Sequence, residues 1–408
     1  MLFNWIFRFF YRLVFSVLLF TFGIVGALAD PSVSFEQFIQ DFEAKALQNG
    51  ISAQTYQRYM GSIELDQKVL ERISAQPEFT TPIWEYIERR VSDDRIDHGV
   101  DAIAQNRELF TSIASKYGVD PFLLAAIWGI ETNYGAVLEN RSLVKPIIPS
   151  LASLVFADRG RVLQDEKQLI AALKLVQGGA DDLLLVGSWA GALGHLQVLP
   201  SVILASGVDG DGDGVVDVNQ SLADALATSA SLLKSFDYES GVDWGYEVKL
   251  PDGFDYAIAS QRQMRPVEFF ANLGVERVAG RKFIDLEQGV FLYVPAGSFG
   301  PKFLMTGNYL VLKSYNASDS YALAVAHLSD RLKGSGSFIS DWPRQAEFPN
   351  REQRVQIQQK LADLGYYEGR IDSFIGPATQ AAYQKFQLSR SLVPDGFVTL
   401  EALRLLGQ

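Results

Sequence analysis

The stretch DPFLLAAIWGIE, residues 120–131, is the most informative part of this sequence. Between its two acids the only polar side-chain atom is the indole nitrogen of Trp128. Asp120 suits the N-cap of a helix, and the proline that follows suits its first turn. A helix that is apolar on all sides belongs inside a domain. We therefore predict a buried helix over residues 121–130 that ends at Glu131.

Glu131, at the end of this helix, is the candidate catalytic group. A carboxyl group at the edge of an apolar helix, beside Trp128 and Tyr134, is poorly hydrated, and poor hydration raises its pKa. A carboxyl group that keeps its proton near neutrality can act as the general acid in the cleavage of a glycosidic bond. The alternative is an ordinary capping or ion-paired glutamate where the helix reaches water, and the local pattern alone favours neither.

A second stretch, GSWAGALGHLQVLPS at residues 187–201, is rich in small residues. Such residues allow the backbone to approach another element or a ligand closely. Ser188, His195 and Gln197 offer neutral hydrogen-bonding groups, which suit sugar hydroxyls and amides. The alternative is a segment in which helices pack tightly.

Together these stretches resemble a known enzyme family. Residues 129–135 (GIETNYG) and 187–201, with residues 314–316 (SYN) and Tyr321 further on, are similar in order and spacing to the lytic murein transglycosylase B family. The resemblance covers residues 34–332. It implies a mainly α (α+β) protein, with a lysozyme-like, mainly helical catalytic domain and a small irregular or β lobe.

The resemblance also implies roles for individual residues. Glu131 is similar to the family's catalytic acid and base, and Ser188 and Asn316 look like the groups that orient this carboxyl group and the sugar. The implied substrate contacts are Gln197, Tyr315, Tyr321, Tyr86 and Tyr134. The chain departs from the family at His195, where a tyrosine is common, and at Val198, where an aromatic residue is found. These departures bear on affinity for the glycan rather than on the reaction.

The implied reaction cleaves the β-1,4 bond between MurNAc and GlcNAc in peptidoglycan and leaves a 1,6-anhydroMurNAc end. One carboxyl group is enough, because the C6 hydroxyl of MurNAc attacks C1 within the same molecule and proximity supplies the effective concentration. No cofactor is expected for this chemistry. Two alternatives remain open: a lysozyme-type hydrolase, which needs a second carboxylate or a placed water, and a non-catalytic scaffold that binds the cell wall.

The acidic loop DGDGDGVVD, residues 209–217, has the spacing of a calcium site. Its carboxylates stand at positions 1, 3, 5 and 9, with glycine at position 6, as in an EF-hand loop. Position 12 is Gln220, so the nearby Asp224 is the candidate to replace the usual closing glutamate. The predicted ligands of a structural Ca²⁺ are Asp209, Asp211, Asp213, the carbonyl of Val215, and Asp224. The alternative is an Asp/Gly-rich turn without metal.

The rest of the predicted catalytic domain, residues 30–333, follows from apolar periodicity. Helical spacing predicts helices over residues 34–75, with a break at Asn49 and Gly50, and over residues 100–117, 221–233 and 321–332. Between residues 243 and 309, short aromatic and β-branched runs broken by glycine and proline predict a small sheet or an irregular lobe.

A separate unit follows the catalytic domain. Residues 334–350 contain glycine, serine and proline and are predicted to be a linker. Residues 351–408 resemble the common three-helix peptidoglycan-binding module, notably through FIGPAT at 374–379, although Ser373 stands where a glycine is usual. A tethered wall-binding module raises the effective concentration of substrate at the catalytic site. The alternative is a folded spacer without affinity for the wall.

The N-terminal residues have the features of a secretory signal. Arg8 and Arg12 flank aromatic residues, an apolar run covers residues 13–25, and small residues follow it. We predict a signal peptide over residues 1–29 and a periplasmic protein; the alternative is a retained membrane anchor. The sequence contains no cysteine, which excludes disulfides and a lipid anchor on cysteine.

The charge balance limits the partners. The formal net charge is −12 at pH 7, which argues against non-specific binding to nucleic acid and against docking on an anionic membrane surface. An uncharged or partly cationic polymer remains compatible. We expect a monomer whose partner is the peptidoglycan glycan strand, with other cell-wall enzymes as further candidate partners.

Overall fold

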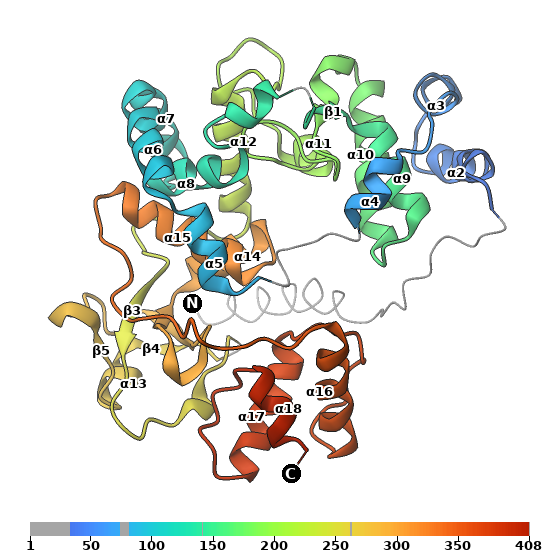
Figure 1. Cartoon of the computed structure of the whole chain (residues 1–408). Coiled ribbons are helices and arrows are strands. Elements are labelled where there is room, and N and C mark those ends of the chain that lie inside the picture. Colours follow the sequence, from blue (N-terminus) through green and yellow to red (C-terminus); the bar gives the residue numbers. More distant parts are fainter. Residues whose placement is uncertain (1–32, 74–80, 141, 262, 408) are drawn as a thin grey trace, which may run out of the picture.

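The structure is a computed structural model that describes residues 33–407 except 74–80, 141 and 262. The predicted signal peptide, residues 1–29, and the end of the first predicted helix at Ala75 lie outside the described residues. The described part is mainly helical with small sheets, which confirms the predicted fold class (Figure 1). No helix in this part is both long enough and apolar enough to cross a bilayer.

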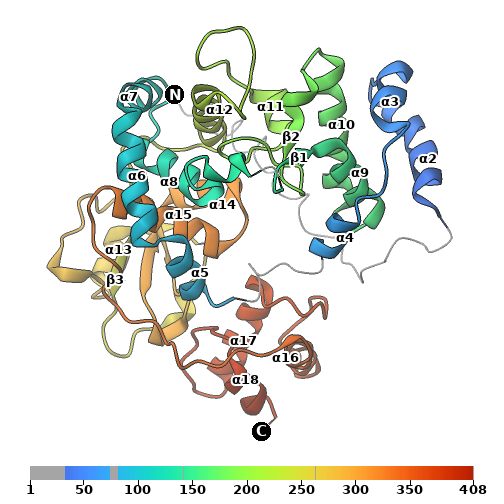
Figure 2. The ribbon, with the colours of Figure 1, turned by 45° about the horizontal axis from the view of Figure 1, so that its top comes forward.

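The larger, N-terminal part of the chain consists of helices around an extensive apolar core. Its helices are α2 (Phe35–Gln48), α3 (Ala53–Met60), α4 (Gln67–Ile73), α5 (Ile83–Arg90), α6 (Asp93–Gln105), α7 (Arg107–Tyr117), α8 (Pro121–Thr132), α9 (Ile147–Ala157), α10 (Val162–Gln177), α11 (Pro200–Ser206), α12 (Leu222–Ser235), α14 (Gly307–Tyr315) and α15 (Asp319–Leu332). Two short strands, β1 (Lys145–Pro146) and β2 (Val186–Gly187), pair antiparallel. Figures 1 and 2 show α2, α3, α4, α9 and α10 on one side and α5 to α8, α14 and α15 on the other.

Helix α8 lies within this core. Its residues 123–130 are all buried, and the Asp120 side chain accepts a hydrogen bond from the Phe122 N–H at 2.9 Å. Helix α15 packs along α8, and α5 and α14 pack against α15 (Figure 1). The predicted buried helix is therefore confirmed, and it extends one residue beyond Glu131.

Two of the predicted helices are interrupted. The helix predicted over residues 34–75 has a second break between α3 and α4. The helix predicted over residues 100–117 is two helices, α6 and α7, and α6 begins earlier, with Ser92 as its N-cap. The Asn106 side-chain amide ends α6 by donating to a carbonyl one turn earlier, at 2.8 Å. A side chain that hydrogen-bonds the backbone in this way competes with continuation of the helix.

A lobe built on an antiparallel five-stranded sheet lies between α12 and α14. The strand order is β4-β6-β7-β3-β5. The elements are β3 (Gly245–Lys249), β4 (Arg265–Pro266), α13 (Val267–Asn272), β5 (Glu276–Arg277), β6 (Gly289–Tyr293) and β7 (Lys302–Met305). The sheet has its own small apolar core, in which Val248 and Phe270 are buried. The small sheet predicted between residues 243 and 309 is confirmed.

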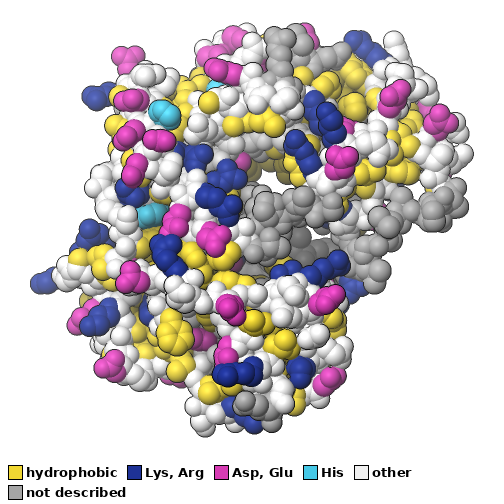
Figure 3. Space-filling model, in the orientation of Figure 1, with side chains coloured by type: hydrophobic (Ala, Val, Ile, Leu, Met, Phe, Trp, Pro, Cys, Tyr) yellow, Lys and Arg dark blue, Asp and Glu magenta, His cyan; other side chains and the backbone are white. Residues whose placement is uncertain are grey.

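The C-terminal residues form a three-helix unit with a separate core, as predicted. Its helices are α16 (Arg351–Asp363), α17 (Pro377–Ser389) and α18 (Leu400–Leu405). Ser373 adopts a φ of 65°, in the left-handed region that favours glycine, which is the physical reason why a glycine is usual there. Figure 3 shows apolar side chains on the surface of this unit. Its exposed apolar residues include Leu388 and Val393.

Residues 334–350, the predicted linker, are all described by the structure and form no helix or strand. They pack against the helical part of the chain. The Phe338 ring stacks on His327 of α15 with 3.9 Å between ring centroids. Further on, Trp342 lies against Trp84 of α5 with 5.9 Å between ring centroids. These contacts fix the path of the segment and the place where the three-helix unit begins.

The three-helix unit also contacts the sheet lobe. The N–H and the hydroxyl of Ser298 both donate to the Asp395 carboxylate, at 2.9 and 2.8 Å. The Gln384 amide donates to the Tyr256 carbonyl at 2.9 Å. A cleft of about 750 Å³ is lined mainly by the three-helix unit and residues 343–347, with Ser298 and Phe299 of the lobe at its edge, and its lining residues do not include Glu131. The unit is therefore docked in this structure rather than suspended from a free tether.

Candidate active site

Glu131 lies in the last turn of α8 and is half-buried. The Tyr321 hydroxyl, from the first turn of α15, donates a hydrogen bond to Glu131 Oε1 at 2.7 Å. Ser318 caps α15 by accepting the Tyr321 N–H, which fixes the start of the helix that carries this tyrosine. Burial, and next the charge of Glu131, raise the pKa of Tyr321 well above its ordinary value, so the hydroxyl remains a donor.

Two more of the predicted site tyrosines lie in the same region. Tyr315, the last residue of α14, donates to the Leu196 carbonyl at 2.7 Å. Burial, and next the charge of Glu131, raise the pKa of Tyr315 above its ordinary value. Tyr86, buried on α5, is among the groups that raise the pKa of Tyr321. The structure thus brings together Glu131, Tyr321, Tyr315 and Tyr86 from α8, α15, α14 and α5.

The run 187–201 consists of tight turns up to the start of α11. Ser188 Oγ accepts the Ala192 N–H at 3.1 Å, and the Ser188 N–H donates to the Ala192 carbonyl at 2.8 Å. Gln197 has a left-handed backbone, with φ of 51°, and its amide donates to the Gly194 carbonyl at 3.0 Å. In this structure the side chains of Ser188 and Gln197 both hold the backbone of their own turn. The run also packs closely on a helix, since a Cβ atom on Gly191 would collide with Leu151 of α9, so the packing alternative stays open.

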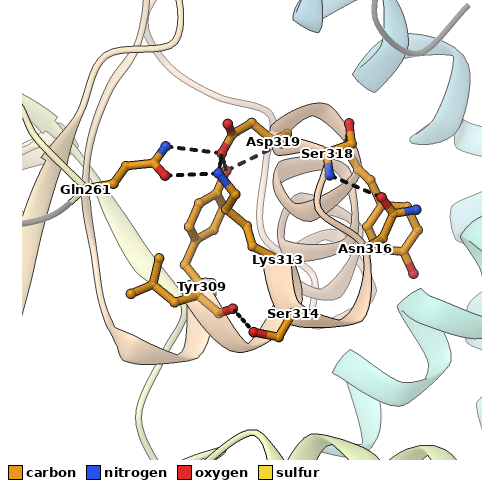
Figure 4. A network of polar contacts seen from close by, with 9 residues as sticks. Gln261, Tyr309, Lys313, Ser314, Asn316, Ser318 and Asp319 are labelled. Carbon is orange, nitrogen blue, oxygen red and sulfur yellow. Dashed lines mark hydrogen bonds and ion pairs between the residues drawn. The ribbon is translucent and has the colours of Figure 1, made fainter. Parts of the chain in front are cut away.

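Asn316 lies between α14 and α15 and is exposed. Its Oδ1 accepts the Ser318 N–H at 3.1 Å, at the N-cap of the helix that carries Tyr321. Figure 4 shows a polar network beside it, in which Asp319 Oδ1 lies 2.7 Å from Lys313 Nζ and accepts the Tyr309 hydroxyl at 3.1 Å. These contacts hold the connection between α14 and α15 and, through it, the start of α15.

Tyr134 has a packing role that the sequence did not predict. Its ring is wedged between Gly99 of α6 and Gly129 of α8, where a Cβ atom on either glycine would collide with it. The hydroxyl is buried and has no hydrogen-bond partner among the described residues. The ring also packs edge-on against Trp128, with 5.5 Å between ring centroids. The partly buried Tyr134 therefore joins α6 and α8, because glycine leaves room for an aromatic ring there.

Two contacts near the site were not predicted from the sequence. The Trp128 indole N–H donates to His195 Nδ1 at 3.1 Å, which connects α8 to the run 187–201. Arg159 makes a two-pronged ion pair with the buried Asp165, at 2.9 and 2.7 Å, and its guanidinium lies 5.9 Å from the Trp189 ring centroid. The sequence pattern gave no signal for either contact. Trp128 and His195 lie far apart in the chain, and Arg159 precedes the helix on which Asp165 lies.

Residues 34–330 match the family model described as the transglycosylase SLT domain. The chain belongs to this family. Residues 350–406 match a second model, described as a putative peptidoglycan binding domain. The enzyme is thus an SLT transglycosylase, and its C-terminal three-helix unit is a peptidoglycan-binding module.

Individual relatives agree with this assignment. SltB3 from Pseudomonas aeruginosa, solved in complex with NAG-anhNAM-pentapeptide, is 37% identical with a TM-score of 0.85, over 92% of this chain and 100% of that chain. The membrane-bound lytic murein transglycosylase B of Escherichia coli (strain K12) is 27% identical over 60% of this chain, and the match spans 66% of that relative. Escherichia coli Slt35, solved in complex with calcium, shares the fold at 24% identity and a TM-score of 0.58, over 73% of this chain and 92% of that chain.

The acidic loop of this transglycosylase gathers three carboxylates. Oxygens of Asp209, Asp211 and Asp213 all lie within 4.8 Å of one another. Asp209 also accepts the N–H groups of Gly212 and Gly214, at 2.6 and 2.8 Å, and these backbone bonds, led by that of Gly214, lower the pKa of Asp209. Three ionised carboxylates this close repel one another, and a cluster of hard oxygen donors fits Ca²⁺.

Asp224, by contrast, does not stand as a fourth member of this cluster. It is buried in the first turn of α12, where its Oδ1 accepts the Gly210 N–H at 2.8 Å and its Oδ2 accepts the Asp217 N–H at 2.7 Å. Both oxygens thus anchor the backbone of the loop, which disagrees with the predicted role of a closing ligand. Val215, whose carbonyl is a predicted ligand, lies in the same turn as the three clustered carboxylates, because its N–H donates to Asp213 at 2.8 Å.

Proposed function

We propose that this transglycosylase cleaves the β-1,4 bond between MurNAc and GlcNAc in peptidoglycan and leaves a 1,6-anhydroMurNAc end. The observation that carries the proposal is the half-buried Glu131, which ends an apolar helix and accepts the Tyr321 hydroxyl at 2.7 Å. The two SltB3 complexes, with NAG-anhNAM-pentapeptide and with NAG-NAM-pentapeptide, support this substrate class for a chain 37% identical to that protein.

In the proposed reaction one carboxyl group acts twice. Glu131 donates its proton to the glycosidic oxygen as the bond from C1 of MurNAc to that oxygen breaks. The carboxylate then takes the proton of the C6 hydroxyl, whose oxygen forms the new bond to C1, so no water is consumed. The Tyr321 hydroxyl donates to Glu131 throughout, which fixes the orientation of the carboxyl group.

The remaining site residues have supporting roles in the proposal. Ser188 and Asn316 orient Glu131 and the sugar, and Gln197 contacts the glycan. The hydroxyl of Ser188 accepts one backbone N–H, so its own proton is available as a donor to a sugar oxygen. Tyr86 and Tyr315 shape the surroundings of Glu131 from α5 and α14.

Product analysis tests this function. The purified protein is incubated with sacculi, and the released fragments are analysed by mass spectrometry. Anhydro ends support the proposal, because only the intramolecular attack forms them. Reducing ends would instead indicate a lysozyme-type hydrolase, and binding without release would indicate a wall-binding scaffold.

A structural calcium ion in the acidic loop is a second part of the proposal. The support is the cluster of Asp209, Asp211 and Asp213; the calcium complex of Slt35 belongs to a relative whose identity here shows the fold alone. A metal that binds the native state alone raises the melting temperature. We expect calcium to raise it in the wild type and a chelator to lower it, whereas a variant with Asp209→Ala and Asp213→Ala responds to neither. A wild type that ignores chelator would make the loop a plain turn.

The proposed setting is the periplasm. Cleavage of a signal peptide after Ala29 would leave a mature chain that begins at Asp30, with the catalytic domain at 30–333, the connecting segment at 334–350 and the module at 351–408. We propose a monomer that binds glycan strands. N-terminal sequencing of the protein from a periplasmic extract tests the cleavage, since a retained anchor would leave the first residues in place.

A further inference from the structure

His195 contacts the last turn of α8 on both sides of Glu131. Its Nδ1 accepts the indole N–H of Trp128, three residues before Glu131, at 3.1 Å. Its main-chain carbonyl accepts the hydroxyl of Thr132, the residue after Glu131, at 2.6 Å. The Thr132 hydroxyl in turn accepts the Gly135 N–H at 3.2 Å, just beyond the helix. One residue from a distant turn therefore holds the helical turn that carries the candidate catalytic group.

His195 is itself held from the other side. Its N–H donates to the Val218 carbonyl at 3.0 Å, directly after the acidic loop. Gly194 makes this approach possible, because a Cβ atom at that position would collide with the Val218 carbonyl. The next residue, Leu196, accepts the Tyr315 hydroxyl from α14 at 2.7 Å. The turn that contacts α8 is thus also held by the residue after the acidic loop and by α14.

The hydrogen bond from Trp128 requires a neutral imidazole. An indole N–H can only donate, so His195 Nδ1 must accept and the ring proton must sit on Nε2. Burial lowers the pKa of His195, against a smaller opposing effect of Asp217, and this favours the neutral ring. The ring also packs edge-on against Trp128, with 5.7 Å between ring centroids.

We propose that His195 is a positioning residue for Glu131. Its Nδ1 holds Trp128 as a hydrogen-bond acceptor, and its main-chain carbonyl holds Thr132. Together these contacts keep the last turn of α8 in the geometry in which Glu131 meets the glycosidic oxygen. The inference rests on the proposed role of Glu131. His195 acts through α8 and need not touch the substrate.

Three variants separate the acceptor from the shape of the side chain. His195→Asn keeps an acceptor close to the position of Nδ1, His195→Leu has nearly the shape of asparagine without an acceptor, and His195→Gln moves the amide towards the position of Nε2. The exposed His98 on α6 gives a matched control, His98→Leu. The readouts are kcat and KM on a soluble glycan, the melting temperature, and the NMR signal of the Trp128 indole N–H, assigned with Trp128→Phe.

We expect His195→Leu to lower kcat about tenfold or more with KM little changed, and His195→Asn to recover most of that loss. The indole signal should move in the leucine variant and stay near its wild-type position in the asparagine variant. His195→Gln should resemble the leucine variant, and His98→Leu the wild type. If His195→Leu does not fold, the asparagine and glutamine variants still differ only in where the acceptor lies.

Equal kcat in the folded asparagine variant and in the variants without an acceptor at Nδ1 would overturn the positioning role. So would a parallel change of KM and melting temperature that asparagine does not rescue, since that result describes a purely structural residue. Failure of the proposed function is a different result: the wild type would release no anhydro product, or Glu131→Gln would be as active as the wild type.

Discussion

The candidate active site and the C-terminal module hold their polar groups in opposite ways. In the site, Glu131 and Tyr321 are 190 residues apart in sequence and meet because α8 and α15 pack together. In the module, the Gln358 amide holds the turn after α16 by donating to Asp372 at 2.9 Å and accepting the Ser373 N–H at 2.8 Å, all within 16 residues. The geometry of the site therefore depends on the whole catalytic domain, whereas that of the module depends on near neighbours. Damage to either should leave the other largely intact.

The largest expected effect comes from Glu131→Gln. The amide keeps the shape of the side chain but cannot donate and then accept the proton, and loss of general acid–base catalysis costs about 10² to 10⁴ in rate. Release of anhydro fragments should fall by that factor while binding to sacculi, which the module supports, stays unchanged. The control is Glu139→Gln, at an exposed glutamate shortly after α8. Turnover near that of the wild type in Glu131→Gln would remove Glu131 from the catalytic role.

Tyr321→Phe should lower kcat about 10- to 100-fold, because a hydrogen bond to a charged group contributes about 1.5–3 kcal/mol. The matched control lies in the module, where Tyr366 donates to Ser389 Oγ at 2.7 Å. Tyr366→Phe also removes one hydrogen bond donated by a tyrosine hydroxyl, here to a neutral hydroxyl, and should leave turnover of soluble glycans unchanged. If both variants lost activity equally, the two regions would not be independent.

The His327 ring links the regions, since it belongs to α15 and stacks on Phe338 of the connecting segment. Burial lowers the pKa of His327 to about 3, against 6.5 for an exposed histidine. A lowered pKa means that stability is fully present above 6.5 and is lost as the pH falls towards 3. At pH 5 the wild type should lose about 2 kcal/mol through this group, and His327→Phe should not.

Urea unfolding at pH 7.5 and pH 5 measures this difference. Half-buried Asp330, whose pKa is raised to about 6 mainly by desolvation, acts in the opposite sense, but it is present in both proteins and cancels from the comparison. An equal loss of stability in the two proteins would show that His327 is not the group that titrates.

Deletion of residues 351–408 should weaken binding to whole sacculi about tenfold or more and spare turnover of short soluble glycans. Short fragments probe the catalytic site alone, and whole sacculi probe site and module together. Equal loss of activity on both substrates by a folded truncated enzyme would make the module part of the active site. Asp395 and Gln384, which hold the module against the sheet lobe, are the contacts through which the deletion would act on the catalytic domain.

Ser298→Ala should have the smallest effect. It removes one of the two bonds to the Asp395 carboxylate and leaves the backbone N–H in place, so about 1.5–3 kcal/mol of docking energy is lost. We expect faster proteolysis within residues 334–350 and a kcat within about twofold of the wild type. A large fall of kcat on soluble glycans would mean that docking shapes the catalytic site.

Much of the fold follows from local sequence. The apolar run 123–130, the Asp120 cap and the short β-branched runs of the lobe act over a few residues, and the structure agrees with each of these predictions. The misplaced boundaries have local causes too: Ser92 and Asn106 are capping residues inside an otherwise continuous apolar pattern. The sequence analysis predicted no element over α9 and α10, because their apolar residues have no clear periodicity and so favour neither a helix nor a strand.

The sequence alone determined the class of the protein, the helix on which Glu131 lies and the existence of a second, wall-binding unit, because periodicity, capping and motif spacing are properties of short segments. The tertiary structure alone decided which polar groups meet. It placed Tyr134 between two glycines, used Asp224 to anchor the acidic loop, and brought His195 to Trp128. Such contacts join segments far apart in the chain, and their distances are set by the packing of α8, α14 and α15 rather than by the residues beside them.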